Sequence, residues 1–264
     1  MPEQDIPQTV LPQKPVKRGI KVWVRADSHN GYFSQFEVYQ GKGSNTTPEL
    51  GLGGSVVKTL TRPLVGKQHH IFMDNFFTSP ALFMDLLQDG IYACGTVRSN
   101  RRGFPQDLKG KRILKNRGDF TVRQSGQLTA TVWLDNKQVQ VMATNVQPDE
   151  RGTVRRRHTD TTVREVQAPT AIISYNKWMG GVDRGDQLRQ YYHLRLKSRK
   201  VYKYIFWFLV DASIANAFIL HQYNTSTSTR PSPFKAFRLE LAKGLIGNYN
   251  SRKRAAPTAA PVVP

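Results

Sequence analysis

The stretch HHIFMDNFFTSPALFMDLLQDGIYACGTV, residues 69–97, decides the fold class of this 264-residue chain. Its first run is short and apolar and ends in Asp74, as a buried strand does at the edge of a sheet. Ser79 follows as a helix N-cap with Pro80 at the first helical position, and the helix is expected to end near Gly90. The next apolar run, IYACGTV, predicts a second buried strand. A strand, a helix and a strand in this order predict an α/β fold, with a sheet covered by helices.

The residues before this stretch predict a β-hairpin and a further helix. GIKVWVRA (19–26) and YFSQFEVYQ (32–40) alternate apolar and polar residues. The Asn30-Gly31 pair between them favours a hairpin turn, because glycine tolerates positive φ. Gly51 to Gly54 are expected to break the chain before SVVKTLTRPLV, whose apolar positions suit one face of a helix.

Residues 98–168 show a different pattern. DFTVRQ, QLTATVWLD and KQVQVMATN read as short strands separated by Ser-Gly and Asp-Asn turn pairs. They predict a small antiparallel meander inserted into the α/β core. Its edges, at 98–117 and 151–164, are rich in Arg and Lys.

The C-terminal third predicts helices. One is expected to begin near Val182, a long apolar one to cover about 199–223, and an amphipathic one to cover about 233–246. The apolar stretch Ile205–Leu220 contains Asp and Asn and is short for a membrane span, so it predicts a buried helix. The expected parts are an irregular lead-in, a first core part, a β-rich insertion, a helical second core part and a basic Pro/Ala-rich tail, at residues 1–18, 19–97, 98–168, 169–250 and 251–264.

The charge balance indicates a polyanionic partner. The chain has 39 Lys and Arg against 19 Asp and Glu, a net charge of +20. This excess argues against an ordinary metabolic enzyme and favours nucleic acid as the partner. Cys94 is the only cysteine, which excludes an intrachain disulfide framework and a Cys-rich zinc module. The six histidines form no metal-ligand pattern, and no phosphate-binding glycine motif supports nucleotide hydrolysis.

Three acidic residues are candidates for a metal site. Asp74 ends a buried strand, and Asp183 and Asp186 occur in GGVDRGDQ at a spacing that places both on one face of a helix. Carboxylate oxygens are the ligands that Mg²⁺ prefers, and two such ions can activate a water in phosphodiester cleavage. Structural roles remain open for all three. Asp74 can form a turn, Asp183 can be an N-cap, and Asp186 can be a first-turn carboxylate favoured by the helix dipole.

Basic residues flank these acids, with Tyr and His interleaved over 184–203. Positive charge and aromatic side chains beside carboxylates fit a surface that holds phosphates, and a merely solvated basic face is the alternative. The residues expected to contact DNA are Arg98, Arg101, Arg102, Lys111, Arg112, Arg184, Arg189, Arg195, Lys197, Arg199 and Lys200.

Three segments together resemble the piggyBac transposase family and its domesticated relatives. They are KPVKRGIKVWVRADSHNGYFSQFEVYQGK, HHIFMDNFFTSPALFMDLLQDGIYACGTVRSNRRGFP and YNKWMGGVDRGDQLRQYY. The resemblance runs from about Lys14 to Tyr223, in order and with similar spacing. It implies a ribonuclease-H-like core with a β-rich insertion, whose aspartates use Mg²⁺ to cut and transfer DNA strands at TTAA sites. By motif, Asp74 corresponds to the second catalytic aspartate of the family, Asp183 to the third and Asp186 to an additional one.

One catalytic position of the family has no counterpart in this sequence. The first catalytic aspartate lies in a DE-x-M-x-x-F-K-G segment before the KPxKxG motif, which begins here at Lys14, so the expected position precedes Met1. Asp5 lies between prolines and Asp27 matches a non-catalytic position, so neither takes this role. In the family that strand lies centrally, between the hairpin and the strand ending in Asp74. The core is therefore expected to be incomplete, and the hairpin to pair elsewhere or leave backbone groups open.

The resemblance implies a truncated, transposase-derived protein that binds double-stranded DNA. Its aspartates are expected to bind Mg²⁺ or Mn²⁺ weakly, without autonomous transposition. The alternatives are a non-enzymatic domesticated DNA-binding protein and a fragment of an active transposase. No zinc, nucleotide, membrane or small-molecule substrate is expected, and a homodimer is compatible with the resemblance. The family and its DNA target imply a nuclear location, to which the SRKR stretch at 251–254 adds a weak signal.

Overall fold

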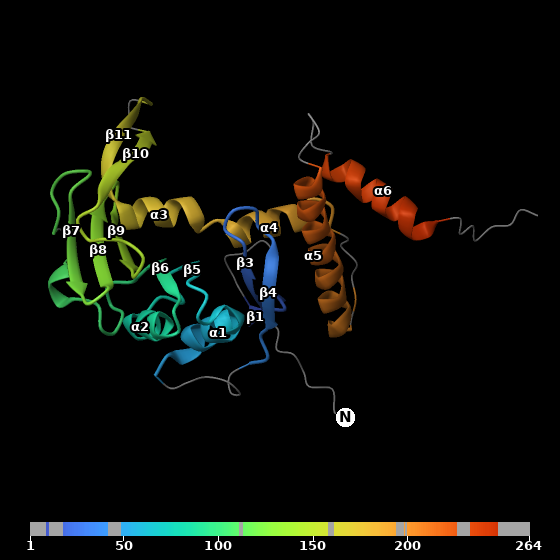
Figure 1. Cartoon of the computed structure of the whole chain (residues 1–264), viewed down its shortest axis with the longest axis horizontal. Helices are drawn as coiled ribbons and strands as arrows, with labels where there is room; N and C mark the ends of the chain where they lie inside the picture. Colours follow the sequence, from blue (N-terminus) through green and yellow to red (C-terminus); the bar gives the residue numbers. More distant parts are fainter. Residues whose placement is uncertain are drawn as a thin grey trace, which may run out of the picture.

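The protein consists of a five-stranded sheet with helices on both faces and a separate hairpin beside it (Figure 1). The structure is a computed structural model. The expected tail at 251–264 lies outside the described residues, which are 9–10, 18–41, 49–110, 113–157, 161–193, 198, 200–225 and 233–247.

The sheet has the strand order β5-β6-β9-β8-β7. β5 (His70–Met73) and β6 (Tyr92–Thr96) are parallel, with His70 opposite Tyr92, as the strand–helix–strand pattern predicts. The other strands pair antiparallel and form the predicted meander. Its members are β7 (Phe120–Ser125), β8 (Leu128–Leu134) and β9 (Gln138–Ala143).

The meander is not a separate sheet. β9 pairs with β6, with Cys94 opposite Ala143 and Thr96 opposite Val141. The Val-Met-Ala end of β9 is fully apolar and buried, so pairing with the equally buried β6 removes both strands from water. The meander therefore extends the sheet of β5 and β6, and the division into domains at residue 98 stays a prediction.

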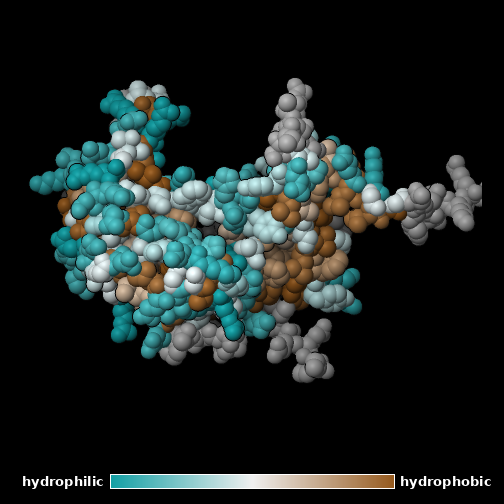
Figure 2. Space-filling view, viewed as in Figure 1, coloured by the Kyte–Doolittle hydropathy of each residue, from teal (hydrophilic) through white to brown (hydrophobic). Residues whose placement is uncertain are grey.

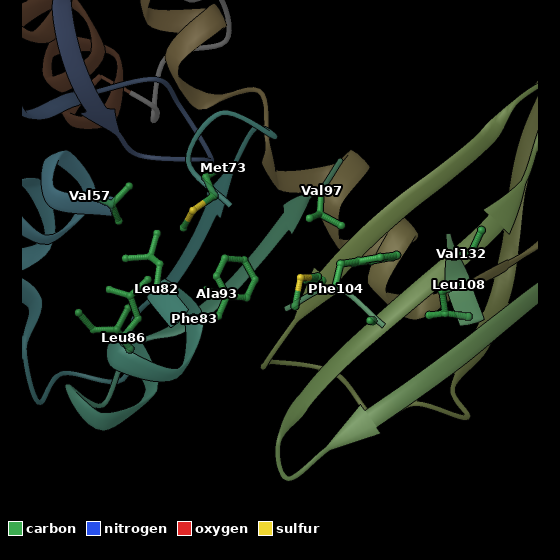
Figure 3. Close-up of a cluster of buried hydrophobic side chains, with 13 residues drawn as sticks. Val57, Met73, Leu82, Phe83, Leu86, Ala93, Val97, Phe104, Leu108 and Val132 are labelled. Carbon is green, nitrogen blue, oxygen red and sulfur yellow. The ribbon is translucent and has the colours of Figure 1, made fainter. Parts of the chain in front are cut away.

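Helices α1 (Gly51–Thr61) and α2 (Pro80–Gln88) cover one face of the sheet. The Ser79 hydroxyl accepts the N–H of Leu82 at 3.3 Å, which confirms the predicted N-cap. Figure 3 shows how the apolar side chains of α2 point toward β5 and β6. This first core comprises Val57, Met73, Leu82, Phe83, Leu86, Ile91, Ala93, Val97, Phe104, Leu108, Ala130, Val132 and Met142.

Gly51 to Gly54 were expected to break the chain before a helix. They instead form the first turn of α1. A Cβ on Gly53 would lie 2.9 Å from the carbonyl oxygen of Phe76. Glycine is therefore needed here for a close approach of the helix to a neighbouring loop. α1 ends at Thr61 and continues as a 3-10 turn, Arg62–Leu64, which contains Pro63.

The opposite face of the sheet carries α3 (Thr170–Trp178) and a two-stranded ribbon, β10 (Arg151–Arg157) and β11 (Val163–Pro169). Ala93 belongs to the first core and its neighbour Cys94 to this second one, because successive strand residues point to opposite faces. The second core comprises Cys94, Trp133, Val141, Ala143, Val166, Ala168, Ala171, Ile172 and Tyr175. Residues 151–164 were expected only as a basic edge of the insertion, and neither strand of this ribbon was predicted.

The predicted hairpin is confirmed as β3 (Val22–Ala26) and β4 (Phe33–Val38). Gly31 in its turn has φ +84°, the conformation that the Asn-Gly pair favours. The hairpin forms a sheet of its own and packs through Trp23 on α1. The lead-in, which was expected to be irregular, contains the short pair β1 (Thr9–Val10) and β2 (Arg18–Gly19).

Three helices form the C-terminal part: α4 (Gly181–Gln190), α5 (Val201–Asn224) and α6 (Phe234–Ile246). By length and composition α5 could cross a membrane, a test that core helices also pass. Only 28% of its apolar window is buried, so the expectation of a buried helix holds for one face alone. Figure 2 shows the other face as apolar surface over α5.

The two polar residues within α5 dock it to the rest of the protein. Asn216 exchanges two hydrogen bonds of 2.9 Å with the backbone N–H and carbonyl of Phe33. Asp211, which is 1% exposed, lies 2.5 Å from Nδ1 of His193, beyond the end of α4. The residues that interrupt the apolar run thus have specific partners.

Candidate functional site

Asp74 lies at the carboxyl end of β5, in the turn that leads to α2. Its side-chain Oδ1 accepts the N–H of Phe76 at 2.8 Å, and its carbonyl accepts from Phe77 and Thr78. The turn role left open by the sequence is therefore confirmed. The side chain is nevertheless exposed, so it can also face a ligand.

Two arginines hold this turn in place. Arg98 Nε donates to Oδ1 of Asn75 at 3.1 Å, and Arg101 Nη2 donates to the carbonyls of Asn75 and Phe76. Arg102 is exposed and has no such contact. Of these three residues expected to contact DNA, two position the loop that carries Asp74.

Asp183 and Asp186 lie on α4, which begins at Gly181, close to the predicted start. Asp183 belongs to the first turn and is not the N-cap, which is Gly180. Asp186 follows one turn later on the same face, and Arg189 donates to its Oδ1 at 3.0 and 3.2 Å. Asp186 therefore has a cationic partner, whereas Asp183 is exposed.

The start of α4 is pressed against the hairpin turn. A Cβ on Gly181 would lie 2.7 Å from the carbonyl oxygen of Asp27, and one on Gly185 would lie 2.5 Å from that of Gly31. Arg184 donates to the carbonyls of Ser28 and His29 at 2.9 and 2.6 Å. The glycines and the arginine of GGVDRGDQ thus fix the helix that carries both aspartates. Arg184, too, has a structural role that the charge pattern did not indicate.

All three aspartates line one cavity of about 640 Å³. The cavity extends along the whole of β3 on one side and the whole of β5 on the other. Tyr175 of α3 also lines it, and its hydroxyl lies 3.4 Å from that of Thr96. Burial raises the pKa of Tyr175, the Thr96 hydrogen bond opposes this, and the charges of Asp74 and Asp183 raise the pKa further. The charges of two carboxylates that are far apart in the sequence therefore both act on the pKa of Tyr175.

Lys21, which precedes β3, places a cation in the same cavity. Its ammonium lies 3.7 Å from the centre of the Trp23 ring and 5.0 Å from that of Phe76. Burial lowers the pKa of Lys21, and the charge of Asp74 opposes that effect. Sequence reasoning missed both Lys21 and Tyr175. Lys21 lies inside the predicted strand run 19–26 and Tyr175 lies five residues before Gly180, the first residue of GGVDRGDQ, so neither position was singled out by its pattern.

Comparison with known proteins identifies the family. A family model described as Transposase IS4 matches residues 7–218. The chain is 34% identical over 235 residues to PiggyBac transposable element-derived protein 3 of Homo sapiens. The chain belongs to the piggyBac transposase family. The sequence resemblance is thereby confirmed.

Further relatives agree with this assignment. PiggyBac transposable element-derived protein 2 of Homo sapiens is 32% identical over 221 residues. The chain has the fold of a piggyBac transposase solved by cryo-EM in a synaptic complex with hairpin DNA, with a TM-score of 0.77 and 29% identity over 90% of this chain. The chain spans 38% and 36% of the two human relatives and 48% of the transposase. The mixed α/β fold is thus that of a piggyBac transposase.

The three aspartates of this piggyBac family member are not arranged around a common position for one metal ion. Within the part of the chain that the structure describes, no group of three or more His, Cys, Asp or Glu could hold one ion. Asp74 is engaged by a backbone N–H and Asp186 by Arg189. The structure therefore brings the three predicted residues to one cavity but does not gather them around one point.

The other residues expected to contact DNA divide into two groups. Arg189, besides binding Asp186, lies with its guanidinium 5.1 Å from the Phe208 ring centre, and Lys200 is exposed before α5. The remaining five, Lys111, Arg112, Arg195, Lys197 and Arg199, lie outside the described residues.

Proposed function

We propose that this protein is a transposase-derived protein that binds double-stranded DNA and does not carry out transposition by itself. The proposal rests mainly on the structural neighbour, a piggyBac transposase in a synaptic complex with hairpin DNA. The likeness to that transposase covers 90% of the present chain. The net charge of +20 supports the same partner, because neutralising phosphates releases counterions.

Among the described residues expected to contact DNA, we assign phosphate binding to those whose side chains do not donate to a neighbouring loop. Arg102 and Lys200 are exposed. Arg98, Arg101 and Arg184 instead donate to neighbouring loops. We therefore assign the first pair to phosphate binding and the other three to shaping the surface.

The proposal of an incomplete ribonuclease-H-like core rests on the cavity between β3 and β5. Among the described residues, β3 pairs only with β4 and β5 only with β6. A strand placed between two others needs a spacing of about 4.8 Å to each. A cavity of about 640 Å³ that follows both strands along their length supports a missing central strand. The aspartates at its rim are then an incomplete set of ligands, which supports loss of strand cleavage.

A binding experiment tests the main proposal. The purified full chain is titrated against a labelled duplex of about 30 base pairs at several salt concentrations, with and without EDTA. We expect affinity to fall steeply with salt, by about 0.9 log units per log unit of salt for each phosphate contacted, and to be unchanged by EDTA. Absence of binding at low salt, or loss of binding in EDTA, would contradict the proposal.

Residual metal-dependent cleavage is the second candidate function. It is favoured by one observation, that Asp74, Asp183 and Asp186 line the same cavity. If it exists, Mg²⁺ or Mn²⁺ should support nicking of duplex DNA that Asp74→Ala abolishes and Asp149→Ala, at an exposed position outside the cavity, retains. Equal nicking by both variants would assign the activity to a contaminant.

A nuclear location and a homodimer complete the proposal. The location follows from the proposed DNA partner, and the homodimer is an expectation from the family resemblance. A fluorescent fusion excluded from the nucleus would contradict the first. Sedimentation of the free chain as a monomer at all concentrations would contradict the second.

A further inference from the structure

The β10–β11 ribbon is set apart from the rest of the sheet. Its strands pair over seven residues each, from Arg151 opposite Pro169 to Arg157 opposite Val163. It shares no strand pairing with the five-stranded sheet and projects from one end of the molecule (Figure 1). Seven residues of antiparallel strand extend over about 24 Å.

One face of the ribbon is fixed to the body. Val154 and Val166 pack into or against the second core, and the side chain of Ile173 lies against Gly152. Arg156 Nε donates to Oδ2 of Asp135 at 2.9 Å, and the Arg156 guanidinium lies 5.6 Å from the centre of the Trp133 ring. The ribbon is therefore a positioned element, and its orientation is set by packing.

The other face meets the core at Arg151, whose guanidinium lies 5.4 Å from the ring centre of Phe120. This face consists of residues that alternate with the packed ones and are all exposed: Arg151, Thr153, Arg155 and Arg157 on β10, and Val163, Glu165 and Gln167 on β11. Three arginines stand against one carboxylate, which lies directly opposite Arg155. The surface is thus basic, with an added hydroxyl and amide and a single apolar side chain.

The dimensions of this face match duplex DNA. The major groove is about 12 Å wide and admits a two-stranded β-ribbon. Alternate residues on one strand, such as Arg155 and Arg157, are about 6.8 Å apart, which is two base steps of about 3.4 Å. Arginine, glutamine and threonine are donors that bind base edges and phosphates.

We propose that the β10–β11 ribbon enters the major groove of duplex DNA with its exposed face, at a surface distinct from the aspartate cavity. This inference rests on the proposed function and adds an element to it. Glu165 lies directly opposite Arg155 across the ribbon, and Arg155 and Arg157 are the two arginines proposed to contact the DNA. The packed face holds the ribbon at a fixed angle to the sheet.

The test uses the full chain with Arg155→Ala and Arg157→Ala combined. We expect affinity for duplex DNA to fall about tenfold or more, and the salt slope to decrease by about 1 to 2, because up to two ionic contacts are lost. The matched control combines Arg62→Ala and Lys67→Ala, which removes the same charge from exposed positions at the end of α1. A thermal melt shows that both variants are folded.

Each outcome has a distinct meaning. If the wild type binds DNA and the ribbon variant binds no worse than the control variant, the ribbon inference is overturned and the proposed function survives. If the wild type does not bind DNA, the proposed function itself fails. Double-stranded RNA has a narrow major groove that side chains cannot read. An equal loss of affinity for RNA would overturn groove entry, and a loss confined to DNA would support it.

Discussion

At the scale of single residues, charge patterns identify basic regions but not the partner of each basic side chain. Arg101 was expected to contact DNA, yet it donates to two carbonyls of the turn that carries Asp74. Its Nε is buried with no partner among the described residues. An arginine held in this way positions an acid, and its contact with DNA stays a prediction.

The roles of Arg101 and its neighbour can be separated by substitution. Arg101→Ala should lower the free energy of unfolding by about 1–3 kcal/mol, because two carbonyls lose a charged donor. Arg102→Ala, at an exposed position, should change it by less than about 0.5 kcal/mol but weaken DNA binding. Urea unfolding and DNA titration of both variants check this. Equal effects of the two changes on stability would refute the assignment.

Cys94 provides a prediction for pH. Burial raises the pKa of its thiol from 9.0 to about 12. The folded state therefore keeps the proton that the unfolded state releases above about pH 9, so stability should be lost as pH rises from 9 toward 12. Unfolding free energies of the wild type and Cys94→Ala, measured between pH 8 and 10.5, should show the steeper decline in the wild type. Parallel declines would show that the buried thiol does not contribute.

At the scale of elements, the site depends on how closely α4 approaches the hairpin turn. Gly185→Ala should destabilise the protein by about 1–3 kcal/mol, because its Cβ would overlap the Phe33 ring and the Gly31 carbonyl. Gly244→Ala in α6 is the matched control, since a Cβ there meets nothing within 4 Å. It should stabilise by about 0.5–1 kcal/mol through helix propensity. Thermal and urea unfolding measure both, and shifts of the same sign would contradict the packing.

The docking of α5 on the hairpin gives a second prediction for an element. Asn216→Ala removes both partners of the Phe33 backbone and should cost about 1–3 kcal/mol. Gln222→Ala, on the exposed side of the same helix, should be nearly neutral. Tryptophan fluorescence during urea unfolding is the measurement. A neutral Asn216→Ala would mean that α5 docks through apolar contacts alone.

At the scale of the whole molecule, local patterns predicted the elements better than their assembly. The hairpin, α2 with its Ser79 cap and the long helix α5 were each readable from periodicity and capping residues. The pairing of β9 with β6 could not be predicted, because a continuous apolar run does not indicate which strand it will pair with. The candidate site was readable as three acids, but their common cavity depends on three elements meeting in space.

Hydrogen exchange tests the proposal of an incomplete core directly. Amides of β3 and β5 that face the cavity should exchange at least about tenfold faster than those of β8 and β9, because the latter strands are paired on both sides. Mass spectrometry of the exchanged chain after peptic digestion measures this difference. Equal protection of β5 and β9 would show that the edge of β5 has a partner.

Along the cavity, β3 and β5 each have one border without a partner strand in the described part of the chain, and this has a practical consequence for handling the protein. Exposed strand borders are templates for self-association, and like-charge repulsion from a net charge of +20 opposes the encounter of two copies. Concentrated salt, the usual means of stripping nucleic acid during purification, screens that repulsion within about 3 Å at 1 M. The wash that removes bound DNA should therefore also promote aggregation.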